Sequence, residues 1–252
     1  MKNATPPLWD MKGEYTMKKF TDAMNDKNFF LPLLMGPNCL KLADEATRGL
    51  DLPRGLRALD LGCGTGLSSM FLAERFGCTV WATDLWIPAT ENFSRFRAFD
   101  MDDRVYPIHA EAHELPYAER FFDAAFSIDS YHYYGAEEGY LETHLAPLVK
   151  PGGLLAVVVP GFQDERYSEE IPEEMKPYWM DDMHFHSCDW WRDLWTRSGV
   201  VRDIAVRELA SHADAWADWL LCDNEYAKRD VGMMEAEAGK YFNSICITAR
   251  VR

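Results

Sequence analysis

The stretch that decides the fold runs from Ala58 to Leu67 and reads Ala-Leu-Asp-Leu-Gly-Cys-Gly-Thr-Gly-Leu. Apolar, β-prone residues lead into three glycines at alternate positions, and the helix-favouring run 67–73 follows at once. This order predicts a strand, a tight turn and a helix N-terminus. Such an arrangement brings unpaired backbone N–H groups close to a ligand.

The spacing of the glycines excludes two common nucleotide-binding loops. The dinucleotide loop of nicotinamide oxidoreductases needs a third glycine at position 67, which is leucine, and a phosphate-binding loop needs Gly-Lys-Ser/Thr. Here Asp60 stands just before the turn. Its carboxylate would repel a pyrophosphate but could pair with an ammonium, so the pattern favours a positively charged nucleoside ligand without phosphate.

Residues 56–66 resemble motif I of the class I S-adenosylmethionine (SAM)-dependent methyltransferases, and four later segments resemble further landmarks in the expected order. These landmarks are the second strand (79–84), the adenine-side segment (110–117), the fourth strand (121–127) and the turn into the fifth strand (148–153). Within the family, the turn after the fourth strand is similar to the ubiquinone/menaquinone methyltransferase-like branch.

This resemblance implies an α/β fold of the Rossmann-like type. The family has a seven-stranded, mostly parallel sheet with an antiparallel last strand and helices on both faces. It also implies SAM as the cofactor and S-adenosylhomocysteine (SAH) as the product.

Composition and charge narrow the class of partner. The 252 residues are 48% hydrophobic and carry a net charge of −15, which argues against a nucleic-acid substrate and against docking on an anionic membrane. Six cysteines without C-x-x-C pairing predict reduced thiols in the cytoplasm. We therefore expect a small, neutral or cationic acceptor, and a monomer or homodimer.

The chain is expected to divide at about residue 54. Residues 1–54 would form an N-terminal helical extension that acts partly as a lid, with helices over 15–24 and 38–50. Residues 55–252 would form the methyltransferase domain, in which strands at 56–61, 79–84, 104–109, 121–128 and 153–159 alternate with helices at 67–76, 88–99 and 136–148. The polar stretch 161–187 would be an insertion at the acceptor site.

The later part of the chain also carries local signals. Ser187 is expected to cap a helix through Trp195, and Ser211-x-x-Asp214 to begin a helix that continues to Tyr226. Residues 200–209 and 241–251 read as the last two strands.

Acidic residues stand where four of the predicted parallel strands end, and ligands bind at this edge of such sheets. By the resemblance, Asp60 and the glycine backbone would hold the aminoacyl end of the cofactor, Asp84 its ribose, and Glu111, where the family usually has aspartate, its adenine. Leu85 would pack on the ring. The predicted cofactor-binding residues are Asp60, Gly62, Cys63, Gly64, Gly66, Asp84, Leu85, Glu111, Ala112 and Asp129.

The turn after the fourth strand holds three tyrosines and a histidine in four residues, 131–134. Tyrosine faces stabilise a sulfonium or ammonium, and a histidine can take a proton near neutral pH. We predict that His132 and Tyr131 are catalytic and that Tyr134 binds the acceptor, whereas Tyr133 is expected to be structural.

Two further histidines, His184 and His186, alternate along the expected insertion. A rim or pocket role at the acceptor and an ordinary loop role are equally open for them. A metal site is not expected, because no third ligand can be identified.

These patterns predict a SAM-dependent methyltransferase with a small-molecule acceptor. The acidic charge and the aromatic clusters favour an amine, with hydroxyl or thiol as alternatives. A non-catalytic SAM-binding protein and a cyclopropane synthase-like enzyme on the same core remain open.

Overall fold

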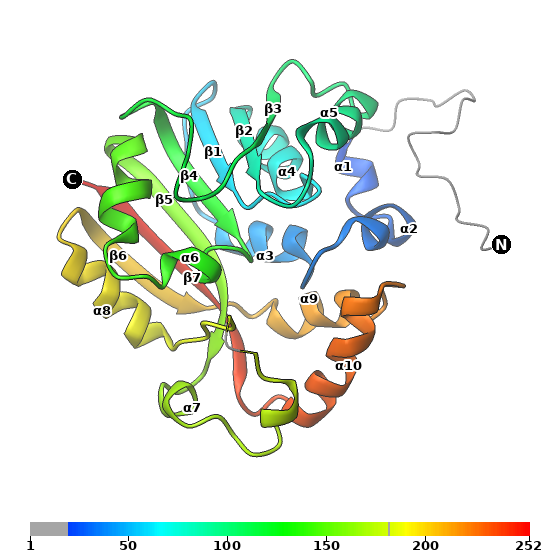
Figure 1. Ribbon diagram of the computed structural model, residues 1–252. Helices are drawn as coiled ribbons and strands as arrows, with labels where there is room; N and C mark the ends of the chain where they lie inside the picture. The colour runs from blue at the N-terminus through cyan, green and yellow to red at the C-terminus, as the bar shows by residue number, and fades with distance from the viewer. Residues whose placement is uncertain (1–19, 181) are drawn as a thin grey trace.

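The computed structural model describes residues 20–180 and 182–252, and its centre is a seven-stranded sheet (Figure 1). The strands lie in the order β3-β2-β1-β4-β5-β7-β6. Their bounds are β1 Arg57–Leu61, β2 Thr79–Asp84, β3 Val105–His109, β4 Phe122–Ile128, β5 Val149–Phe162, β6 Val201–Glu208 and β7 Phe242–Val251. The predicted fold class is confirmed.

The strand order places the candidate site. β1 pairs in parallel with β2 on one side and with β4 on the other, so the chain reverses its winding direction beside β1. A crevice opens beyond the carboxyl ends of the strands at such a point. The last strand, β7, is antiparallel as expected, and it lies between β5 and β6 and pairs with both.

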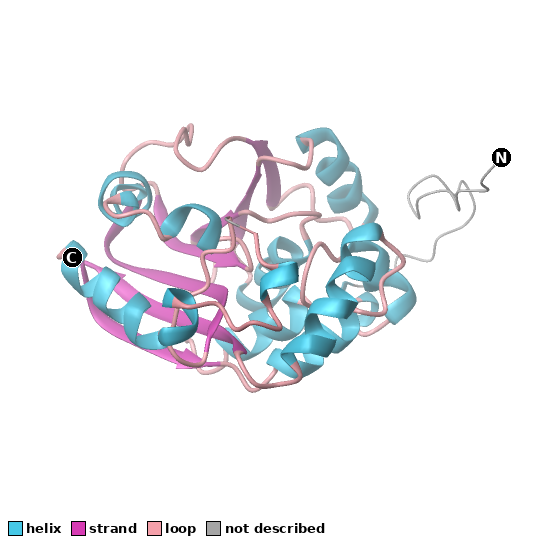
Figure 2. Cartoon of the chain, turned by 60° about the horizontal axis from the view of Figure 1, so that its bottom comes forward, coloured by secondary structure: helices cyan, strands magenta, loops and turns pink. Residues whose placement is uncertain are grey.

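Both faces of the sheet are buried, and β5 shows why. Leu154, Ala156 and Val158 pack into one hydrophobic cluster, whereas Leu155 and Val157 pack into the other. Successive side chains of a strand point to opposite faces, so a continuous apolar run fills two cores. Figure 2 shows helices on both sides of the strands.

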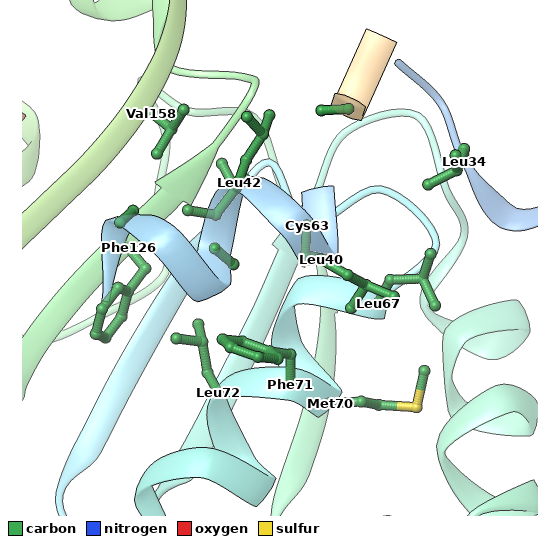
Figure 3. Close-up of a cluster of buried hydrophobic side chains, with 14 of the residues drawn as sticks. Leu34, Leu40, Leu42, Cys63, Leu67, Met70, Phe71, Leu72, Phe126 and Val158 are labelled. Carbon is green, nitrogen blue, oxygen red and sulfur yellow. The ribbon is translucent and has the colours of Figure 1, made fainter. Parts of the chain in front are cut away.

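The first face is covered by α3 Cys39–Ala46 and α4 Leu67–Phe76. Figure 3 shows Leu40 and Leu42 of α3 above Phe71 of α4, with Phe126 of β4 to their left. Part of the predicted N-terminal extension is therefore built into the main core and does not fold as a separate body. The other helices of this end of the chain are α1 Phe20–Ala23, α2 Lys27–Phe30 and α5 Ala89–Ala98.

The second face is covered by α8 Cys188–Ser198 and by the segment between β4 and β5. The continuous helix predicted over 136–148 is wrong: the segment contains α6 His132–Gly135, a π-helical turn Leu141–Leu145 and a 3₁₀ turn Ala146–Leu148. Gly139 has a φ of 91°, a left-handed conformation that interrupts a right-handed helix.

Two predicted helix starts have different outcomes. The Ser187 cap is confirmed, because its side chain accepts a hydrogen bond from the Trp190 N–H. The Ser211 side chain makes no capping bond; the Glu45 carboxylate instead accepts the N–H groups of Ala210 and Ser211 at 3.0 and 2.7 Å.

The helix expected to continue to Tyr226 is in fact two helices. α9 His212–Trp219 ends early, and Asn224 caps a separate helix, α10 Glu225–Glu237. Residues 15–19 of the first predicted helix lie outside the described residues. The short helix α7 Arg166–Glu169 lies in the expected insertion, and no helix of the described chain is long and apolar enough to cross a membrane.

Candidate functional site

A cavity of about 280 Å³ lies at the carboxyl ends of β1, β2 and β4. Its walls come from five segments: 33–39, 61–68, 83–86, 110–113 and 128–134. Four of these segments follow strands of the sheet, and the fifth belongs to the N-terminal extension. The cavity therefore occupies the crevice that the strand order creates.

The glycine loop lines the cavity because nothing larger fits its turns. A Cβ on Gly62 would lie 1.9 Å from the Ser130 Oγ, and Gly62 also has a φ of 73°. The loop does not offer the unpaired N–H groups that the sequence predicts: Gly62 and Cys63 both donate to the Thr83 carbonyl, at 2.8 and 3.0 Å. Gly66 packs away from the cavity, since a Cβ there would meet the Phe96 ring at 2.4 Å.

Asp84 ends β2 and lines the cavity while only 7% exposed. One carboxylate oxygen accepts the Gly64 N–H at 2.7 Å, and the other accepts the N–H groups of Trp86 and Ile87 at 2.8 and 2.9 Å. Carboxylate oxygens can accept further hydrogen bonds. Asp84 is therefore fixed in place and still able to accept the hydroxyls of a sugar.

Asp60 does not line the cavity, which corrects the expected direct contact with the aminoacyl end. Its carboxylate is fully buried and accepts the hydroxyls of Ser68 and Ser69 at 2.7 and 2.6 Å. Burial raises its pKa to about 6, and the Asp84 charge adds to the rise. Asp60 thus holds the start of α4 behind the glycine loop.

Glu111 and Ala112 line the cavity beyond the end of β3, beside a histidine that the sequence analysis missed. His113 Nδ1 lies 2.8 Å from Glu111, and its Nε2 lies 3.0 Å from Glu137. The hydrogen bond to Glu111 raises the pKa of His113, with burial opposing, and the same bond lowers the pKa of Glu111. His113 therefore orients Glu111.

Asp129 follows β4 and lines the cavity with its backbone at a φ of 61°. Its carboxylate lies against Gly36, where a Cβ would come within 2.4 Å of Oδ2. Burial, and then the charge of Asp230, raises the pKa of Asp129 to about 8.

Tyr131 and His132 do not line the cavity. Tyr131 is fully buried, with its ring 5.9 Å from the rings of Trp191 and Trp195. His132 is 4% exposed, and burial followed by the His184 charge lowers its pKa to about 3. This histidine is thus held neutral inside the protein.

The next two tyrosines do line the cavity. The Tyr134 hydroxyl is hydrogen-bonded to the hydroxyls of Ser127 and Ser130, at oxygen–oxygen distances of 3.1 and 3.3 Å. These bonds fix the Tyr134 hydroxyl at the inner wall of the cavity. Tyr133, expected to be structural, is 46% exposed at the mouth, and its ring lies 5.6 Å from that of Trp86. Leu85, on the same turn as Trp86, also lines the cavity.

His184 and His186 lie away from the cavity, as do the other described residues of the expected insertion. His184 is exposed. His186 Nδ1 lies 2.7 Å from Glu165, and its ring stacks on Trp190 at 3.6 Å. These contacts give His186 a structural role between α7 and α8.

Residues 33–39 form one wall of the cavity. The sequence analysis predicted a lid in residues 1–54 but did not identify which of these residues line the cavity. Asn38 ties it to α9, because its N–H donates to the Ala215 carbonyl at 3.0 Å and its amide donates to Asp218 at 2.8 Å. Asp218 also pairs with Lys27 and Lys41 at 3.0 and 2.6 Å. The Thr65 hydroxyl donates to the Leu33 carbonyl, so the same wall is joined to the glycine loop.

These groups fit an adenosyl ligand. Asp84 supplies hydrogen-bond acceptors for a ribose, Leu85 supplies apolar surface for a base, and Glu111 can accept from its amino group. The absence of a side chain at Gly62 lets Ser130 pack directly against the glycine loop beside them.

Comparisons with known proteins agree with this geometry. Residues 58–153 match the model of a family described as "Methyltransferase domain". Methyltransferase GfsG of Streptomyces halstedii is 29% identical over 62% of this chain and 59% of that protein. The 27-O-demethylrifamycin SV methyltransferase of Amycolatopsis mediterranei is 32% identical over 46% of this chain and 43% of that protein. The chain thus matches about half the length of these relatives.

The fold is also that of a solved structure. The geranyl diphosphate C-methyltransferase of Streptomyces coelicolor A3(2), in complex with Mg²⁺, geranyl diphosphate and SAH, has a TM-score of 0.66 and 18% identity. The likeness covers 84% of this chain and 80% of that one. At this identity the comparison establishes the architecture.

Proposed function

This chain carries a class I SAM-dependent methyltransferase domain, and we propose that the whole protein transfers a methyl group from SAM to a small molecule. The observation that carries the proposal is the cavity at the ends of β1, β2 and β4, where Asp84 and Glu111 face a glycine loop with no room for side chains. When bound, SAM supplies an electrophilic methyl group on a sulfonium.

The chain's own residues would bind and orient the two reactants. Asp84 would accept the ribose hydroxyls, and Glu111, held by His113, would accept from the adenine amino group. Residues 33–39 would act as the lid that excludes water, and Tyr134 would face the acceptor. Tyr133 and Trp86 at the mouth would contact the acceptor, whereas Tyr131, predicted to be catalytic, does not line the cavity.

An amine is the favoured acceptor, ahead of a hydroxyl or thiol. Acidic side chains line the cavity, whereas no Lys or Arg of residues 20–180 and 182–252 does. A cation is therefore attracted and an anion repelled. We further propose a cytoplasmic protein, monomeric or homodimeric, that takes no nucleic acid or membrane as partner, in keeping with its net charge of −15.

The test is turnover. The purified protein is incubated with SAM and matched amine, alcohol, thiol and alkene panels, and SAH and product formation are followed by mass spectrometry. Binding of SAM without SAH formation across the panels would favour a non-catalytic SAM-binding protein. A product heavier by a methylene bridge across an alkene would favour the cyclopropane synthase-like alternative.

A further inference from the structure

Three carboxylates and one histidine line the cavity, and three of these four side chains are already engaged by the protein. Asp84 accepts three backbone N–H groups, and Glu111 and His113 bind each other. No residue of the described chain donates a hydrogen bond to the Asp129 carboxylate. The oxygens of a half-buried carboxylate that accepts no hydrogen bond from the protein are free to accept hydrogen bonds from a ligand.

The position of Asp129 separates it from the nucleoside groups. Asp84 and Glu111 follow β2 and β3, on one side of β1, whereas Asp129 follows β4, on the other side. The glycine loop after β1 lies between them. If the ribose and base of the cofactor lie along β2 and β3, the opposite end of the cofactor, which carries the sulfonium, therefore lies toward Asp129.

The mouth of the cavity is apolar. Met35, Trp86 and Tyr133 line it, and their exposed fractions are 45%, 64% and 46%. Large apolar side chains left exposed around a cavity indicate a ligand with apolar surface of its own. Two of these three side chains are aromatic, which also suits contact with a cation.

Deepening the function proposed above, and resting on it, we propose that Asp129 binds the ammonium group of an amphipathic amine acceptor and takes one proton from it. The acceptor's apolar body then lies against Met35, Trp86 and Tyr133. The substrate class is thus a primary or secondary amine on an aromatic or aliphatic body.

The proton and electron balance is complete with the two reactants alone. The ammonium loses a proton to the Asp129 carboxylate and becomes a neutral amine. Its lone pair forms the N–CH₃ bond as the S–CH₃ bond breaks, and that bond's electron pair stays on sulfur. The product is a methylated ammonium, and the proton on Asp129 returns to solvent.

The surroundings of Asp129 suit this proton transfer. Asp230 of α10 contributes negative charge at Asp129, and Tyr133 of α6 and the Cys39 thiol of α3 face the same region. Burial, followed by Asp60 and Asp129, raises the pKa of Cys39 to about 12, so this thiol stays neutral. A carboxyl whose pKa is about 8 is ionised above that pH, and it then accepts a proton more readily than an ordinary aspartate, so the transfer is favoured on the alkaline side of neutrality.

The test uses Asp129→Asn, since asparagine removes the charge yet tolerates the left-handed backbone at this position. The matched control is Asp189→Asn, a carboxylate on α8 that is 89% exposed. Each protein is first titrated with SAH by calorimetry. The SAH-saturated protein is then titrated with 2-phenylethylamine and, separately, with 2-phenylethanol.

The wild-type protein and Asp189→Asn should bind the amine about 10-fold or more tighter than the alcohol, and Asp129→Asn should lose that preference. SAH affinity should be the same in all three. An unchanged preference in Asp129→Asn, no preference in the wild type, or a loss of SAH binding in Asp129→Asn would each overturn the assignment. Failure of the wild type to bind SAH is a separate result, which removes the proposed function itself.

Discussion

The Asp84 carboxylate accepts the Gly64 N–H at 2.7 Å, so the end of β2 is bonded directly to the glycine loop after β1. The same side chain also holds the turn into α5 through Trp86 and Ile87. Asp84 thereby fixes two walls of the cavity as well as facing into it. Loss of its charge should affect stability and cofactor affinity together.

Asp84→Asn should weaken SAH binding by about 10-fold or more and reduce the free energy of unfolding by about 1–3 kcal/mol. The amide can keep one acceptor oxygen but turns its NH₂ toward a backbone N–H. Calorimetry and urea unfolding measure the two effects. Asp103→Asn, at an exposed carboxylate on the surface, should change neither; an unaltered SAH affinity in Asp84→Asn would remove Asp84 from the ribose role.

Gly62→Ala should abolish SAH binding, because the new methyl group collides with Ser130 and displaces one wall. Gly55→Ala is the matched control: its φ of 77° is close to the 73° of Gly62, yet nothing lies within 4 Å of its Cβ position. Both variants should be destabilised by backbone strain, on the order of 1 kcal/mol. Equal SAH affinity in the two would show that the close approach at Gly62 is unimportant.

The His113–Glu111 pair predicts a pH-dependent term in stability. The raised pKa of His113 means that its contribution is fully present below the unfolded value of about 6.5 and is lost as pH rises through the folded pKa. The lowered pKa of Glu111 means that its contribution is present above about 4.5 and is lost as pH falls through the folded pKa. The Tm difference between the wild type and His113→Asn should therefore be largest between about pH 4.5 and 6.5, where both contributions are present.

Glu137→Gln tests whether Glu137 contributes to the raised pKa of His113. His113 then keeps only Glu111 as an anionic partner, so NMR titration of the His113 ring should give a pKa lower than in the wild type. An identical titration curve would show that Glu137 does not hold the imidazolium.

Two substitutions in the turn after β4 should distinguish a residue that packs in the core from one that contacts the ligand. Tyr131→Ala should reduce the free energy of unfolding by about 3–5 kcal/mol, because it empties space against two tryptophans. Tyr133→Ala should cost much less stability and instead lower kcat/KM for the acceptor. Urea unfolding and steady-state kinetics decide between the two; a stable Tyr131→Ala with impaired turnover would restore the catalytic role.

His132→Ala is expected to lower Tm while specific activity per folded molecule stays near that of the wild type. A histidine whose pKa is about 3 remains neutral from pH 5 to 9, so the pH–rate profile should not change with the substitution. Disappearance of one limb of the profile would contradict this expectation.

Asp218→Ala should release the 33–39 wall, since three partners lose their acceptor at a buried site. A loss of about 2–4 kcal/mol and a weaker SAH affinity are expected. Asp44→Ala removes solvent-accessible pairs with Arg48 and Arg75 in the same part of the chain and should cost about 1 kcal/mol or less. Equal melting temperatures for the two variants would argue against the tie.

The first five strands could be predicted from the sequence, and most of their ends lie within one or two residues of the predicted positions. Each is a largely apolar run, and β2 ends at Asp84, which lines the cavity, so pattern and position agree there. Asp60 of β1 fits the same pattern but is buried behind the glycine loop. β5 is longer than expected because its pairing with β7 extends to Phe162. α10 was missed as a separate helix because it buries only Ala227, Met233 and Glu237 and so shows a weak apolar face.

The acceptor turn shows where sequence reasoning stops. Tyr131 to Tyr134 are four consecutive polar aromatics, and their composition alone predicts a pocket. Consecutive residues of a helical turn point about 100° apart, so only some can face one cavity. Which pair does so depends on the packing of Tyr131 between α8 tryptophans far away in the sequence, a contact no local pattern reveals.

The position of β7 has a consequence for synthesis of the protein. Until residues 242–251 have left the ribosome, β6 has no neighbour in the sheet and β5 presents an unpaired, apolar edge. Open edges of this kind invite pairing with other chains. The nascent chain would therefore be most prone to aggregate just before β7 emerges, and would benefit most from chaperone binding at that moment.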